Sequence, residues 1–158
     1  MARRTFFSFR YKNDNWRANI IRNSWVTQER KAAGFFDSAE WETVKRQGDS
    51  SIEKWIDGQL AGTSVTVVLI GADTAGKKWI NYEIESSRTR GNGLLGIYIH
   101  SIKDSTGNIS TQGQNPFDDP IFKKNRASAA YPVYNWIIQD GYKNLGLWIE
   151  KAAIAAGK

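Results

Sequence analysis

The 158-residue chain contains no cysteine and a single histidine, His100. Without cysteine there are no disulfides, no thiolate metal ligands and no redox chemistry at sulfur. One histidine excludes a multi-histidine metal centre, so we expect no bound metal. Long apolar runs are also missing: the longest, Val65 to Ile70, has the length of a strand, and the apolar stretch near the N-terminus stops at Arg10. Neither could span a bilayer or act as a signal peptide, so we expect a cytoplasmic protein with no membrane partner.

The chain is basic, with a formal charge of +6 and a pI near 9.6. Its Lys and Arg residues lie in scattered pairs and not along one helix or arm, so we do not expect nucleic acid as a partner. Apolar residues make up 41% of the chain and aromatic residues 13%, which is ample for a hydrophobic core. We expect a single domain over residues 1–158.

Strand-like and helix-like segments alternate along the sequence. Period and capping signals predict strands at 4–10, around Phe35-Phe36, 65–70, 94–100 and 131–137, and helices after Asp14, at 49–60, at 77–90 and at 141–157. The residues after Phe36 are expected to be irregular, as is the long polar stretch 101–119. This alternation predicts an α/β fold: a flavodoxin-like three-layer sandwich with a central parallel five-stranded sheet. Ligands of such sheets bind beyond the carboxyl ends of the strands.

Residues Gly71 to Lys78 read G-x-x-x-x-G-K-K, one position short of a phosphate-binding P-loop. That motif needs a serine or threonine after its lysine to hold magnesium, and Lys78 stands there instead. It also needs a second strand that ends in aspartate, whereas the best candidate strand ends in His100. The glycines therefore indicate an ordinary turn between a strand and a helix.

Trp79 and Glu83 are four residues apart, so they share one face of the expected helix 77–90. Ile80 and Ile84 form the neighbouring face, which should pack on the sheet. Two interpretations follow from the spacing. The pair is either a solvated glutamate beside a boundary tryptophan, or a partly desolvated carboxylate whose pKa is tuned for chemistry.

The segment "TFFSFRYKND" resembles the first conserved box of TIR domains, where a strand of F-x-S-F type ends in a polar turn with arginine. "TSVTVVLIGADTAGKKWINYEI" is similar to their later segment, in which a strand precedes a helix reading W-x-x-x-E-I. "AAGFFDSAEWE" and "NPFDD" are similar to segments of the bacterial TIR-like group of Thoeris anti-phage systems, the ThsB group. The resemblance covers most of residues 4–150.

The resemblance implies an enzyme that cleaves NAD+ at the nicotinamide–ribose bond, with Glu83 as the catalytic residue. NAD+ would be the substrate, and no cofactor is expected. Cleavage generates an oxocarbenium-like ribose, which one nearby carboxylate can stabilise. The resemblance implies that the product is a cyclic or otherwise modified ADP-ribose signal, which activates a partner effector protein.

Other residues are candidates for binding the substrate. Phe9, Trp41 and Trp79 could stack on nicotinamide or adenine, and Arg10 could pair with the pyrophosphate. Asn115 could form a wall of the pocket. Three of these residues also have a structural interpretation. Phe9 could be a core aromatic, Arg10 a solvated strand end, and Trp41 a plug at the sheet edge.

Two other functions are compatible with the same fold. TIR domains associate, so the chain could be a homo-oligomeric adaptor that signals by assembly and has no catalytic activity. A receiver-like phosphoacceptor would need acidic residues after the first strand, where "SFRYKND" offers arginine and lysine instead. Release of nicotinamide from NAD+ distinguishes the enzyme from the adaptor.

Overall fold

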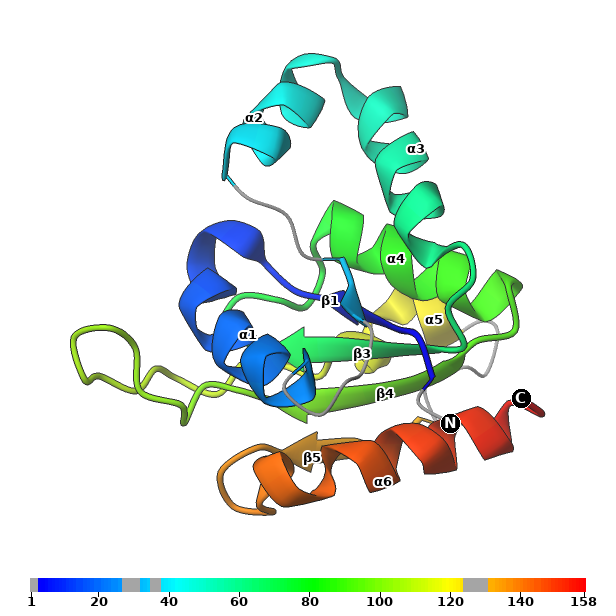
Figure 1. Cartoon of the computed structure of the whole chain (residues 1–158). Helices are drawn as coiled ribbons and strands as arrows, with labels where there is room; N and C mark the ends of the chain where they lie inside the picture. Colours follow the sequence, from blue (N-terminus) through cyan, green and yellow to red (C-terminus); the bar gives the residue numbers. More distant parts are fainter. Residues whose placement is uncertain (1–2, 27–31, 35–37, 124–130) are drawn as a thin grey trace.

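The computed structural model describes residues 3–26, 32–34, 38–123 and 131–158 (Figure 1). In chain order its elements are β1 (Thr5–Ser8), α1 (Tyr11–Val26), β2 (Ala32–Ala33), α2 (Ser38–Arg46), α3 (Asp49–Leu60), β3 (Val65–Ile70), α4 (Lys78–Thr89), β4 (Gly93–Tyr98), the 3-10 helix η1 (Pro116–Asp118), α5 (Pro120–Lys123), β5 (Val133–Asn135) and α6 (Gly141–Ala155).

The strands lie in the order β2-β1-β3-β4-β5, and all neighbouring pairs are parallel. That order is the one found in flavodoxin-like sheets. Strands β1, β3, β4 and β5 form the body of the sheet, and β2 adds a two-residue pairing with β1 at one edge. All six residues of β3 are buried, as expected for a central strand covered on both faces.

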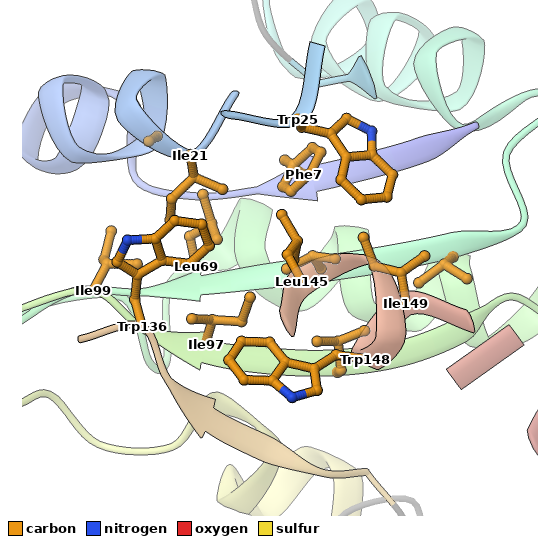
Figure 2. Close-up of a cluster of buried hydrophobic side chains, with 14 of the residues drawn as sticks. Phe7, Ile21, Trp25, Leu69, Ile97, Ile99, Trp136, Leu145, Trp148 and Ile149 are labelled. Atoms are coloured by element: carbon orange, nitrogen blue, oxygen red, sulfur yellow. The ribbon is translucent and has the colours of Figure 1, made fainter. Parts of the chain in front are cut away.

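Helices cover both faces of the sheet, and side chains alternate between them. Phe7, Val67 and Ile97 point to the face covered by α1 and α6, where they join Trp25 and Trp148 in the largest core cluster (Figure 2). On the opposite face, α3 and α4 pack against the alternate residues of β1, β3 and β4. The result is a three-layer arrangement with α1 and α6 on one side and α3 and α4 on the other (Figure 1).

The prediction of an α/β fold with a parallel sheet flanked by helices is confirmed. Several details were wrong, and the expected strands 4–10 and 131–137 are shorter, at Thr5–Ser8 and Val133–Asn135. Helix α1 begins at Tyr11, so Asp14 lies in its first turn and not before it. Residues 38–46, expected to be irregular, form helix α2. Strand β4 ends at Tyr98, two residues before His100.

The strand expected around Phe35-Phe36 falls on residues 35–37, outside the described residues. Among the residues that are described, no helix combines the length and the apolar character needed to cross a bilayer.

Arg17 on α1 fixes the start of the long loop that follows β4. Its side chain is buried, and it donates hydrogen bonds to the carbonyl oxygens of Ile102 (Nε, 2.6 Å) and Asn108 (Nη2, 3.0 Å). Between these two points the chain makes a turn around Asp104, whose carboxylate accepts hydrogen bonds from the backbone N–H groups of Thr106 and Asn108. Helix α1 and this loop are therefore joined at the carboxyl edge of the sheet.

Candidate active site

A cavity of about 360 Å3 lies at the carboxyl edge of the sheet, where sequence reasoning places the ligand. It is lined by residues from the end of β1, the start of α1, α2, α3 and the first turns of α4: Phe9, Arg10, Tyr11, Lys12, Lys45, Ile52, Lys77, Lys78, Trp79, Ile80 and Glu83. Its volume is in the range of small-molecule sites. A larger cavity, of about 610 Å3, lies at the amino ends of β4 and β5 and contains none of the predicted site residues.

Among the described residues that line this cavity, Glu83 is the only one with a carboxyl group. It lies on the buried stripe of α4 with Ile80, Ile84 and Ser87, and only 9% of the residue is exposed. Burial raises the pKa of the Glu83 carboxyl from 4.5 to about 8, because desolvation disfavours the charged form. Within the described part of the chain, the carboxyl forms no ion pair.

Ser8 approaches Glu83 from the last position of β1. Its hydroxyl lowers the pKa of the Glu83 carboxyl, against the larger effect of burial. The residue is fully buried, and its Oγ has no partner of full hydrogen-bond geometry among the described residues. The Ser8 hydroxyl therefore lies close to the carboxyl without a well-aligned hydrogen bond.

A chain of buried hydroxyl groups fixes α4 against the sheet behind Glu83. Thr66 Oγ1 on β3 is 2.7 Å from Ser87 Oγ, which donates to the backbone carbonyl of Glu83 at 2.7 Å. All three residues are buried, so the bonds form where water cannot compete. This contact holds the backbone of Glu83 at a fixed height above β3.

The aromatic side chains beside the cavity have two different roles in packing. Trp79 meets Tyr82 edge to face, with ring centroids 5.8 Å apart, and the ammonium group of Lys78 lies 4.8 Å from the centroid of its indole. Trp79 is half-buried and forms part of the wall. Phe9 also lines the cavity, but its ring belongs to the core cluster between the sheet and α1.

Cations surround the entrance, and carboxylates hold three of them. Arg10 Nη1 lies 3.4 Å from Asp73 Oδ2, and Lys77 Nζ lies 3.2 Å from Asp73 Oδ1. Lys78 forms an ion pair with Asp49 at the start of α3. The cavity thus combines one buried acid with a basic entrance.

The glycine turn after β3 is closed by contacts from within the protein. The backbone N–H of Gly71 donates to Thr74 Oγ1 at 2.8 Å, and the carboxyl group of Asp14 lies against the Gly71 Cα. Burial raises the pKa of Asp14 to about 6, while Arg17 and Arg10 lower it. A P-loop would offer this N–H to phosphate, so the contacts support reading the segment as an ordinary turn.

The structure brings together four of the six predicted site residues: Phe9, Arg10, Trp79 and Glu83 line the same cavity. Asn115 lines a separate cavity of about 410 Å3 and caps η1 through a hydrogen bond from the Phe117 N–H, 2.9 Å long. Helix α2 carries Trp41, whose side chain is outside the described part of the chain. The substrate-binding roles of all these residues stay predictions.

Sequence reasoning missed Ser8 and Asp73. Strand alternation could have identified Ser8, because it places Ser8 on the opposite face from Phe7 and Phe9, the face that α4 covers. No comparable signal marks Asp73, since its two ion pairs depend on the path of the 71–76 turn.

The parallel α/β sheet, with a tryptophan and a buried glutamate one helical turn apart at its carboxyl edge, matches the arrangement that the resemblance to TIR domains implies. The family model of the Thoeris protein ThsB TIR-like domain matches residues 6–104. The chain is also 35% identical over 191 aligned positions to a Bacillus cereus (strain MSX-D12) protein named "Putative cyclic ADP-D-ribose synthase ThsB1", with 94% of this chain and 100% of that protein covered. The chain belongs to the ThsB TIR-like family.

Proposed function

We propose that the chain is an NAD+-processing enzyme of Thoeris anti-phage defence, which cleaves the nicotinamide–ribose bond and makes a cyclic ADP-ribose-derived signal. The observation that carries this proposal is the buried carboxyl of Glu83 inside a cavity with a basic entrance. The name of the Bacillus cereus relative supports the same activity. We also propose that β2 completes a five-stranded flavodoxin-like sheet around this site.

The charge of NAD+ matches the two parts of the cavity. Its pyrophosphate is anionic and suits the cations at the entrance, Arg10 among them. Its nicotinamide ring is cationic and suits the position beside Glu83. A cation placed next to a buried acid favours the ionised form, so bound NAD+ lowers the pKa of the carboxyl and drives off its proton.

Ionised Glu83 then favours cleavage. The bond between the ribose C1′ and the nicotinamide nitrogen breaks, its electron pair goes to the ring, and neutral nicotinamide leaves. The positive charge now lies on the ribose, where the buried carboxylate stabilises it. Capture of C1′ by an adenine nitrogen closes a cyclic product, and capture by water gives linear ADP-ribose.

Incubation of the purified protein with NAD+, followed by mass analysis of the products, tests the proposal. We expect nicotinamide and a cyclic ADP-ribose isomer from the wild type and neither from Glu83→Gln. Glu85→Gln is the matched control, because Glu85 lies two positions along the same helix and pairs with Arg88 at the surface. Equal turnover in Glu83→Gln and wild type, with both folded by circular dichroism, would reject the role of Glu83.

The adaptor alternative is favoured by one feature, a set of large apolar side chains left exposed on α6. Tyr142, Leu147 and Ile154 are 65%, 56% and 65% exposed. Exposed apolar groups on one helix suit association between copies of the chain. A protein that only assembles would release no nicotinamide at any concentration, and its critical residues would lie on α6.

A further inference from the structure

Asp73 lies between two cations that face the proposed substrate site. It follows β3 in the 71–76 turn, and its side chain is 53% exposed. One carboxylate oxygen is 3.4 Å from Arg10 Nη1 and the other is 3.2 Å from Lys77 Nζ. The same arginine atom also donates to the backbone carbonyl of Asp73, at 3.3 Å.

Both cations belong to the wall of the Glu83 cavity, whereas Asp73 does not. Arg10 follows β1 and Lys77 precedes α4, so they approach from two sides of the entrance. Asp73 therefore neutralises two of the charges that a polyphosphate would need. A carboxylate held between an arginine and a lysine occupies the kind of position that a phosphate group takes in a complex.

We propose that Asp73 is an internal competitor for the pyrophosphate group, so that Arg10 and Lys77 exchange this carboxylate for the substrate's phosphates on binding. This inference rests on the proposed function, and it assigns Lys77 and Asp73 to the phosphate end of the site. Asp73 is a specificity-determining residue and does not touch the reacting atoms. Its carboxylate weakens the binding of anionic groups to this pair of cations.

The exchange is energetically feasible because both ion pairs are exposed. Ion pairs at the surface contribute little and break easily, so Asp73 tunes affinity without blocking the site. Its charge also repels phosphate directly while it remains nearby. Removing the charge should therefore strengthen the binding of a pyrophosphate ligand and leave the chemistry at Glu83 unchanged.

The test measures the Kd of ADP by titration calorimetry, because ADP carries the pyrophosphate and lacks the nicotinamide that is cleaved. We expect Asp73→Asn to bind ADP about three- to tenfold more tightly than wild type, the effect of two exposed ion pairs that no longer have to break. The gain should shrink in the double variant with Arg10→Ala, since one of the two cations is then absent.

Glu150→Gln is a closely matched control. Glu150 pairs with Arg3 at 2.9 Å, and the side chains of that pair are 25% and 47% exposed, against 27% and 53% for Arg10 and Asp73. The substitution makes the same charge change away from the cavity, so it should leave the Kd of ADP unchanged. An Asp73→Asn protein that binds ADP no more tightly than wild type, or only as much more tightly as Glu150→Gln, overturns the inference.

The kinetic readout separates this inference from the proposed function. If NAD+ is cleaved, Asp73→Asn should lower KM for NAD+ by a similar factor and keep kcat. If NAD+ is cleaved but neither KM nor the Kd of ADP changes, only the inference about Asp73 fails. If ADP binds more tightly to Asp73→Asn but no nicotinamide is released by any form, the phosphate site stands and the proposed enzyme activity fails.

Discussion

Replacing Glu83 with glutamine should stabilise the protein while abolishing its activity. The side chain keeps its size and its polar character but can no longer ionise. The folded protein holds the Glu83 proton up to about pH 8, whereas the unfolded chain releases it near pH 4.5. The pKa of Glu83 is higher in the folded protein than in the unfolded chain. Glu83 therefore lowers the free energy of unfolding progressively as pH rises from about 4.5 to 8, and it has no such effect below pH 4.5.

The pKa difference sets the size of the effect. At pH 7 the penalty for keeping this group folded is about 3 kcal/mol, from 1.36 kcal/mol per pKa unit. It falls below about 1 kcal/mol at pH 5 and approaches about 5 kcal/mol above pH 8.5. Glu83→Gln should recover these amounts, which corresponds to a rise in Tm of about 6–12 °C at pH 7 for a domain of this size.

Urea unfolding of wild type and Glu83→Gln at pH 5, 7 and 8.5 measures the difference directly. The control Glu85→Gln removes one exposed pair with Arg88 and should change the free energy of unfolding by less than about 1 kcal/mol. The decisive result is the trend with pH. If Glu83→Gln is stabilised equally at pH 5 and pH 8.5, or is not stabilised at all, the carboxyl is not desolvated in the folded protein and the reasoning about its pKa is wrong.

Three further outcomes are expected. The kcat/KM for NAD+ should rise about tenfold per pH unit below pH 7 and level off above pH 8, because it follows the ionisation of Glu83 in the ligand-free enzyme. A flat profile between pH 6 and 8 would contradict this. Gly71→Ala should lower the free energy of unfolding by about 2–3 kcal/mol because its Cβ would meet the Asp14 carboxyl, and urea titration should show a smaller loss in the Asp14→Ala background. Ser87→Ala should lower the free energy of unfolding by about 1–3 kcal/mol in the same assay, because it leaves the Thr66 hydroxyl unpaired. Adding Thr66→Val should recover part of that loss. Equal stability of the single and the double variant would argue against the buried bond.

The sequence predicted best the elements whose own pattern of apolar residues shows which of their faces are buried. The β-branched run at 65–70 can only be a strand buried on both faces, and the helix after it repeats its buried positions at the spacing of a helix turn. From these two segments the positions of Trp79 and Glu83 at the carboxyl edge followed directly. The structure adds that Glu83 is buried by Ser8 and the β1 end, a contact between residues 75 positions apart that helical spacing could not reveal.

The loops were less predictable because distant contacts shape them. Asn115 was placed at the pocket by its position in a polar loop, but the hydrogen bond to the Phe117 N–H turns that loop into a cap for η1, beside a different cavity. Asp73 meets Arg10 across 63 positions of the sequence, in a turn whose first residue, Gly71, packs against Asp14. None of these contacts leaves a periodic pattern in the sequence.

The clamp formed by Arg17 also determines where the chain can tolerate insertions and deletions. The guanidinium fixes the carbonyls of Ile102 and Asn108, and hydrogen bonds among Asp104, Thr106 and Asn108 hold the turn between them. Extra residues added at 104–107 would lengthen a projection that is already closed at its base, at a free-energy cost that grows only slowly with length. A single residue added on the other side of Asn108 would instead shift the register of every residue down to η1. We therefore expect one arginine to confine differences in chain length to the few positions between its two contacts.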